Sequence, residues 1–159
     1  MKHLRAIEPE DLDLMYIIEN DLRLWRHGNT TAPYSRYALH QYLNTTQNDI
    51  YKDSQVRFAI DHCGFLDITD FAPQHHRASI GIVLCPESQG QGLATQAINE
   101  AHIYARTVGI HQLWATVATD NTPALRLFER CGYQNIATLP QWLVIDDNYR
   151  DARLYSKIL

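Results

Sequence analysis

Residues 80–95, Ile-Gly-Ile-Val-Leu-Cys-Pro-Glu-Ser-Gln-Gly-Gln-Gly-Leu-Ala-Thr, lead from an apolar run through a Gly-rich segment into a helical pattern. The apolar run predicts the end of a strand, and the helical pattern continues to Val108. A turn between a strand and a helix exposes backbone N–H groups, and the helix N-terminus adds partial positive charge. This segment therefore predicts a phosphorylated ligand that is held by the main chain.

The composition indicates one ordinary globular domain, residues 1–159. The chain is 45% hydrophobic and 20% charged, which is typical of a soluble protein with one sizeable core. Its net charge of -4 argues against nucleic acid as a partner. No apolar run approaches the ~20 residues of a membrane span, and residues 1–5 lead into no signal-like core, so no membrane partner is expected. Three scattered cysteines fit reduced thiols in the cytoplasm: Cys63, Cys85 and Cys131.

The remaining pattern predicts an α/β protein with a mixed sheet, in the order βααβββαβαββ. Helices are expected to begin at Pro9, at Ser35, after the Gly-rich segment and near Asn121, where short polar residues and proline suit a helix start. Residues 26–33 are expected to form a loop. Strands are predicted at residues 4–7, 56–60, 65–71, 77–84, 113–118, 141–145 and 150–158.

The Gly-rich segment does not match two common nucleotide motifs. A P-loop requires Lys followed by Ser or Thr after the glycines, and no such Lys-Ser or Lys-Thr pair follows them in this chain. A dinucleotide fingerprint requires a third Gly or Ala where Thr95 stands, within the first βαβ unit of the chain. A nucleotide-binding protein of another fold stays open as an alternative.

The spacing Gln89-x-x-Gly92-x-Ala94 resembles the Q/R-x-x-G-x-G/A signature of the GCN5-related N-acetyltransferase (GNAT) family. Residues 77–81, 86–88 and 121–133 are similar to further segments of that family. The closing hairpin resembles that of the ribosomal-protein and spermidine acetyltransferase branch. The resemblance runs from about Leu4 to the end of the chain. It implies the GNAT fold, in which a central, mostly antiparallel mixed sheet is flanked by helices and splayed at the cofactor cleft.

The resemblance also implies acetyl-coenzyme A as cofactor. The amides of the Gly-rich turn would bind its pyrophosphate, and the splayed strand before the turn would bind pantetheine through its backbone. Asn121 would cap its helix and also contact the cofactor. The implied cofactor-binding residues are Ile82, Val83, Leu84, Gln89, Gly90, Gln91, Gly92, Leu93, Ala94, Thr95, Asn121, Ala124 and Phe128.

Direct transfer to an amine requires a neutral amine, a donor for the oxyanion and a proton for the leaving thiolate. Many relatives supply that proton from a Tyr where this chain has Phe128, and they carry Glu where it has Ser79. Ser79 and Phe128 are therefore departures at catalytic positions, and a non-catalytic acyl-coenzyme A sensor stays open beside the acetyltransferase. Tyr133 is either a displaced donor or a core residue. The candidate bases are Asp67, Asp70, His75, His76 and Glu19.

The acceptor is expected to be a small amine, such as a polyamine, or the N-terminus of a peptide. By resemblance its contacts come from the first two helices, their loop and the late hairpin. Acidic side chains at Glu19, Asp67 and Asp146 would suit a cation. No metal site is expected, because His75 and His76 lack further ligands at a recognisable spacing. A homodimer stays open. The candidate acceptor residues are Glu19, Asn20, Trp25, Tyr34 and Trp142.

Overall fold

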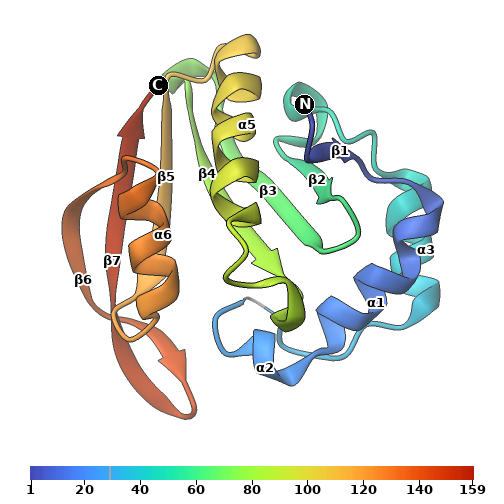
Figure 1. Ribbon diagram of the computed structural model, residues 1–159, viewed down its shortest axis with the longest axis horizontal. Helices are drawn as coiled ribbons and strands as arrows, with labels where there is room; N and C mark the ends of the chain where they lie inside the picture. Colours follow the sequence, from blue (N-terminus) through green and yellow to red (C-terminus); the bar gives the residue numbers. More distant parts are fainter. Residues whose placement is uncertain (29) are drawn as a thin grey trace.

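The computed structural model describes residues 1–28 and 30–159 and contains one seven-stranded sheet in the order β1-β2-β3-β4-β5-β7-β6 (Figure 1). Only the central β4–β5 pair is parallel among the described strand pairs, which confirms the predicted, mostly antiparallel mixed sheet. The strands are β1 Leu4–Ala6, β2 Val56–Ile60, β3 Gly64–Ala72, β4 Arg77–Leu84, β5 Gln112–Ala118, β6 Gln134–Ile145 and β7 Asn148–Ile158.

The four predicted helices are present. Two of them begin at the expected caps, Ser35 and Asn121, whereas the first, expected at Pro9, begins as an α-helix only at Leu12, after a 3₁₀ turn. The Ser35 hydroxyl accepts a hydrogen bond from the Ala38 amide at 3.0 Å, and Asn121 Oδ1 accepts one from the Ala124 amide at 3.3 Å. Two single-turn helices, α2 and α4, were not predicted. The α-helices are α1 Leu12–Asn20, α2 Leu22–Trp25, α3 Arg36–Thr45, α4 Ile50–Asp53, α5 Leu93–Thr107 and α6 Thr122–Arg130; 3₁₀ turns lie at Pro9–Asp11, Pro73–His75 and Pro86–Ser88.

Alternating side chains of the strands build a core on each face of the sheet. On one face Phe58 and Leu66 pack in a cluster that also contains Ile98 of α5. On the other face Ala59 and Phe65 pack with Met15 and Ile18 of α1 and Leu39 of α3. Helix α5 thus covers one face of the first half of the sheet, and α1 and α3 cover the other (Figure 1).

The parallel strands β4 and β5 diverge after a short paired stretch. They pair only at Arg77–Gln112, Ala78–Leu113 and Ser79–Trp114. Beyond Ser79, β4 continues to Leu84 with β3 as its partner, and its other edge faces no strand in the described chain. The predicted splay is therefore confirmed, and it opens directly before the Gly-rich segment.

One strand boundary was predicted wrongly. β6 begins at Gln134, whereas the sequence pattern predicts residue 141. The pattern fails because two irregularities in the pairing of β6 with β7 break the alternation of side chains that identifies a strand. Gln141 itself has a φ of 51°, in the left-handed region. Asn29, within the predicted loop 26–33, lies outside the described residues. None of the described helices has the length and apolar character needed to cross a membrane.

Candidate active site

The Gly-rich segment forms a tight turn before α5. Gly90 and Gly92 have φ values of 77° and 82°, which glycine adopts without steric cost. The side-chain amides of Gln89 and Gln91 donate to the carbonyls of Leu84 and Glu87 at 3.2 and 3.1 Å. The side chains of both glutamines therefore hold the shape of the turn.

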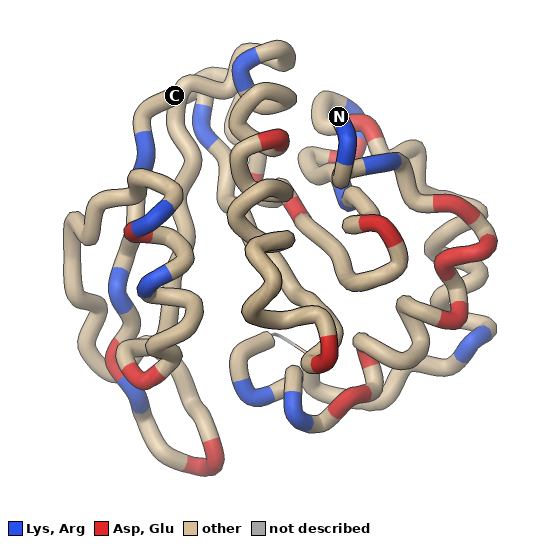
Figure 2. The backbone as a smooth tube through the Cα atoms, viewed as in Figure 1, with Lys and Arg blue, Asp and Glu red and all other residues tan. Residues whose placement is uncertain are grey.

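The backbone amides of residues 90–95 are the candidate binding groups of this turn. Within residues 1–28 and 30–159 none of them donates to a protein acceptor, and the first helical bond runs from the Gln96 amide to the Gly92 carbonyl at 3.2 Å. A Cβ added at Gly90 would meet no atom within 4 Å. Residues 88–99 carry no charged side chain (Figure 2). Unpartnered N–H groups beside open space fit a pyrophosphate, and they need no basic side chain.

Asn121 and Phe128 have different surroundings on α6. Asn121 is half-buried at the N-terminus of the helix, where its oxygen acts as the cap. Phe128 is buried, and its ring lies edge-on to Tyr133 at 5.1 Å and stacked with Tyr155 at 6.1 Å between centroids. The position that carries a tyrosine in many relatives is therefore an apolar part of the core in this chain. Ala124, one turn before Phe128, packs against the same core.

Tyr133 lies in the core and its hydroxyl is already hydrogen-bonded. It is 3.1 Å from His102 Nε2 on α5, and both side chains are buried. Burial raises the pKa of Tyr133 far above its ordinary value. Burial is also the main cause that lowers the pKa of His102 to about 4, with the charges of Lys157 and Arg106 adding to it. Of the two predicted alternatives for Tyr133, a displaced proton donor or a core residue, the structure therefore fits the core residue.

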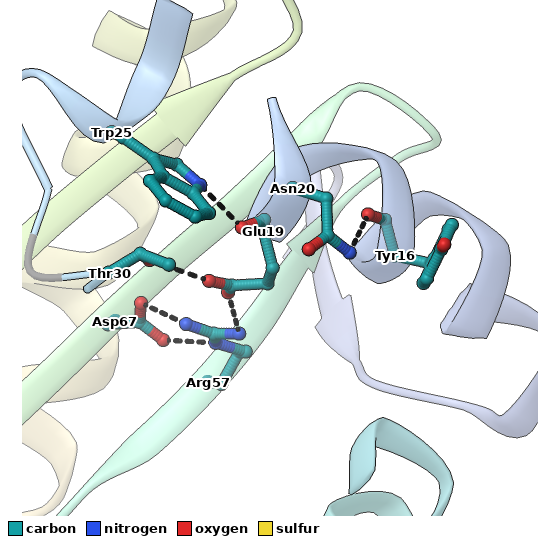
Figure 3. A network of polar contacts seen from close by, with 7 residues as sticks. All are labelled: Tyr16, Glu19, Asn20, Trp25, Thr30, Arg57 and Asp67. Carbon is teal, nitrogen blue, oxygen red and sulfur yellow. Dashed lines mark hydrogen bonds and ion pairs between the residues drawn. The ribbon is translucent and has the colours of Figure 1, made fainter. Parts of the chain in front are cut away.

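Two predicted carboxylates meet at one arginine that the sequence analysis did not identify (Figure 3). Arg57 donates to both oxygens of Asp67, at 2.7 and 2.9 Å, and to Glu19 Oε1 at 2.9 Å. Burial would lower the pKa of Arg57, but its charge and hydrogen-bond interactions with Asp67 and Glu19 outweigh this and raise it. The guanidinium is thus permanently charged, and it neutralises part of the acidity expected here.

Strand register places this ion-pair network beside the splay. Arg57 of β2 lies opposite Asp67 of β3, which lies opposite Gly81 of β4. Ser79 is on the same face as Gly81 and belongs to the last β4–β5 pair, with Trp114. Gly81 has no side chain, and a Cβ there would meet nothing within 4 Å. The face of the sheet that carries Asp67 is therefore open toward the point where β4 and β5 diverge.

A groove of about 500 Å³ lies between α2 and β6 and brings Trp25 and Trp142 together. It is joined to the ion-pair network, because the Trp25 indole donates to the Glu19 carbonyl at 2.7 Å and the Thr30 hydroxyl to Glu19 Oε2 at 3.4 Å (Figure 3). The residues lining this α2–β6 groove are Leu22, Trp25, Arg26, Gly28, Thr30, Thr31, Trp142, Leu143, Val144, Ile145 and Asp146.

Asn20 and Tyr34, also predicted to contact the acceptor, do not line the groove. The Asn20 side chain accepts from the Tyr34 amide at 2.9 Å and donates to the Tyr34 carbonyl at 3.1 Å, so it holds the chain after α2 in place. Asp70 is exposed at a bulge of β3 with a φ of 51°. His76 contacts the Gly109 carbonyl at 2.9 Å, far along β4 from the Gly-rich turn. Among the described residues no three His, Cys, Asp or Glu side chains gather as metal ligands.

Arg57 and Gly81 are the residues that sequence reasoning missed. A signal existed for Arg57, because a buried charge within the otherwise apolar strand Val-Arg-Phe-Ala-Ile requires a partner. That partner lies across the sheet, and the strand pattern does not identify it. Gly81 shows no turn pattern, so nothing in the sequence marks it as part of a site. It matters only because it lies opposite Asp67 in the sheet.

Comparison with known proteins gives consistent matches over the chain. The family model described as "Acetyltransferase (GNAT) domain" matches residues 3–134. The spermidine N(1)-acetyltransferase of Vibrio cholerae serotype O1 is 28% identical and covers 98% of this chain and 94% of its own. The structure of a spermidine N-acetyltransferase from Vibrio cholerae in complex with CoA and spermine superimposes with a TM-score of 0.85 at 26% identity, over 98% of this chain and 94% of that one. A structure of the same enzyme described as dodecameric gives a TM-score of 0.81 at 27% identity, over 98% and 92%.

Proposed function

This chain belongs to the acetyltransferase (GNAT) family and is an acetyl-CoA-dependent N-acetyltransferase, and from that premise we propose which residues bind the cofactor and position the amine. The observation that carries the assignment is the set of unpartnered amides at residues 90–95. They would hold the pyrophosphate. The free edge of β4 at residues 82–84 would pair with pantetheine, as an added strand does. Asn121 keeps its side-chain N–H groups free of protein acceptors in the described chain and would donate them to the cofactor.

The amine would enter where β4 and β5 part, on the face that carries Ser79 and Asp67. Acetyl-CoA supplies an activated thioester there, and positioning of the amine against it accounts for much of the acceleration. Asp67 remains the proposed base, and two hydrogen bonds from Arg57 orient its carboxylate. The Ser79 hydroxyl, half-buried at the end of the β4–β5 pairing, would hold a water that relays the proton.

Phe128 has no proton to give to the leaving thiolate. A thiol has a pKa of about 8.5, so its thiolate leaves a thioester without strong acid assistance. We therefore propose that transfer in this chain proceeds without a side-chain acid at position 128, and that the ring of Phe128 contributes only packing near the thioester. This distinguishes the chain from relatives with tyrosine at that position.

Self-association and a cytoplasmic location are part of the same proposal. The sheet face of β5, β7 and β6 that faces away from α6 has a hollow of about 400 Å³ with apolar walls, among them Trp114, Leu139 and Leu154. Exposed apolar surface of this kind is typical of an interface. A homo-oligomer, with the homodimer as its smallest form, would cover it. The three free cysteines suit a reducing compartment.

The test combines calorimetric titration with acetyl-CoA and a thiol-release assay with a panel of amines. We expect binding at micromolar levels and thiol release with at least one primary amine. Gly92→Glu should abolish binding, because it adds bulk and negative charge at a positive-φ position of the cradle. Asn99→Glu adds the same charge on the exposed side of α5 and should bind normally. Binding without thiol release across the panel would leave a non-catalytic sensor, and normal binding by Gly92→Glu would refute the assigned cradle.

A further inference from the structure

The hollow on the face of β5, β7 and β6, here named the β5–β7 hollow, begins at the splay. On β5 it is lined by Gln112, Trp114 and Thr116. Trp114 belongs to the last β4–β5 pair, with Ser79, and Thr116 lies beyond that pair, where the two strands diverge (Figure 1). Because the proposed function places the thioester at this point, the hollow of about 400 Å³ is the space next to its acyl group.

The β5–β7 hollow has apolar walls and a positive charge at one end. Trp114, Leu139 and Leu154 supply apolar surface. At the end that is far from the Gly-rich turn, Arg77 begins β4 and lies opposite Gln112. Among the described residues that line the hollow, Arg77 alone carries a charge. An acyl chain that enters from the splay therefore runs along apolar side chains toward a cation.

Arg77 has no carboxylate partner among residues 1–28 and 30–159. It is exposed, and no described carboxylate oxygen lies within 4 Å of its guanidinium. Asp70, at the neighbouring bulge of β3, does not line the hollow. Arg26, Arg36 and Arg57, by contrast, each lie within ion-pair distance of a carboxylate of this chain. A guanidinium without a partner suits a carboxylate of a ligand, which it binds through two parallel hydrogen bonds.

A buried hydroxyl adds a second donor at the same end. Ser156 of β7 is 7% exposed, and its oxygen accepts a hydrogen bond from Gln112 Nε2 at 2.6 Å. In the part of the chain that the structure describes, its own O–H donates to no protein acceptor. Because Gln112 is the strand partner of Arg77, the hydroxyl and the guanidinium lie at one end of the hollow. Both are available to the same carboxylate.

The strand register indicates how long the acyl chain is. Ser79, at the last β4–β5 pair, and Arg77 are two residues apart on one face of β4, a separation of about 6.6 Å. An acetyl group is too short to span it, whereas a succinyl or glutaryl chain and the flexible arginine side chain span it together. Resting on the proposed function, we infer that this protein also uses an acyl-CoA whose acyl group ends in a carboxylate, and that Arg77 binds this carboxylate in the β5–β7 hollow.

The reaction is the same transfer with a longer acyl group. The neutral amine attacks the carbonyl carbon of the thioester, so that a C–N bond forms and the C–S bond breaks. The proton of the amine passes to Asp67, and coenzyme A leaves as a thiolate that takes a proton from water. The terminal carboxylate takes no part in these steps. Self-association over this face would close the hollow above the acyl chain, which enters from the splay.

The first test is calorimetric titration of the unmodified protein with two stable thioethers of coenzyme A. S-(3-carboxypropyl)-CoA has the chain length of succinyl-CoA, and S-butyl-CoA replaces its carboxylate by a methyl group. We expect the carboxylated thioether to bind about tenfold more tightly. Equal affinities, or tighter binding of S-butyl-CoA, would refute the inference.

The second test compares acyl donors in turnover. Thiol release is measured for acetyl-CoA, butyryl-CoA and freshly prepared succinyl-CoA across the amine panel, and the rate without amine is subtracted. We expect kcat/KM for succinyl-CoA to exceed that for butyryl-CoA by about tenfold. If acetyl-CoA is used and succinyl-CoA is no better than butyryl-CoA, the inference fails and the proposed function stands. If no donor releases thiol with any amine, the proposed function itself fails.

Variants of Arg77 assign the preference to its charge. Arg77→Met should bring the affinities for the two thioethers to within about twofold of each other, and Arg77→Lys, which keeps the positive charge, should retain part of the preference. Arg106→Met is the matched control, because it removes an exposed arginine from the last turn of α5, and it should keep the tenfold preference. A preference that survives in Arg77→Met, or that falls equally in Arg106→Met, would overturn the inference.

Discussion

The buried, neutral His102 ring should make the stability of the fold fall in mild acid. His102 is 5% exposed on α5, and its Nε2 is 3.1 Å from the Tyr133 hydroxyl. Burial is the largest cause of its lowered pKa, about 4 against an ordinary 6.5, and Lys157 and Arg106 lower it further. Below pH 6.5 the unfolded chain binds a proton that the folded chain does not bind. Stability is therefore complete above pH 6.5 and decreases until the folded pKa is reached.

The size of the effect follows from these two pKa values. A difference between 6.5 and about 4 corresponds to about 3 kcal/mol in full. Between pH 7.5 and pH 5.0 the unfolded histidine becomes protonated and the folded one stays largely neutral, so about 2 kcal/mol is lost in that interval. This is a large fraction of the 5–15 kcal/mol that holds a typical domain. Asp11 and Glu100, whose pKa values are lowered, act mainly below this interval.

The measurement is urea unfolding at pH 7.5 and pH 5.0, followed by tryptophan fluorescence and circular dichroism. His102→Gln keeps a hydrogen-bond acceptor for Tyr133 but removes the titration, so it should lose about 2 kcal/mol less than the unmodified protein over this interval. His40→Gln changes an exposed histidine on α3 and should behave like the unmodified protein. Equal losses in the unmodified protein and His102→Gln would refute the reasoning.

Three further outcomes are expected. Asn121→Asp keeps the helix cap, so its free energy of unfolding should stay within about 0.5 kcal/mol of the unmodified protein, whereas Asn121→Ala should lose about 1 kcal/mol. Calorimetry should show weaker acetyl-CoA binding for Asn121→Asp, since this variant places a negative charge against a polyanion. Unchanged binding would contradict the proposed cofactor contact. Glu100 binds the amides of His3 and Leu4 at 3.0 and 2.9 Å, so Glu100→Gln should cost about 1–3 kcal/mol in urea unfolding at pH 7. Burial acts to raise the pKa of Glu100 but these amides lower it overall, so the stabilisation is present above the ordinary pKa of 4.5 and the two proteins should converge as the pH falls through the folded value. Initial rates of thiol release should not change in EDTA, because no cluster of metal ligands exists among residues 1–28 and 30–159, and a loss of rate restored by a divalent cation would contradict this.

The features that sequence reasoning predicted well are local. The turn at Gly90 and Gly92, the cap at Asn121 and the strand before the turn all depend on residues a few positions apart. The start of β6 was missed because its irregular pairing with β7 is a property of two strands, and the alternation in one strand does not reveal it. Helices α2 and α4 have only four residues each, which is too short for a helical period to be recognised.

The same distinction separates the two halves of the active site. The cofactor half lies almost entirely within residues 80–95. The spacing of its residues is therefore visible in the sequence, and the proposed ligand follows from that spacing. The acceptor half combines α1, α2, β2, β3 and β6, and its character depends on which charges meet across the sheet. Glu19 and Asp67 predict an acidic cleft when taken singly, but Arg57, which the fold places between them, offsets part of their charge. A substitution at Arg57 would thus change the charge that the acceptor half presents to the amine, while the amides that hold the cofactor stay as they are. The measurement that separates the two halves is kcat/KM for different amines at a constant acetyl-CoA affinity.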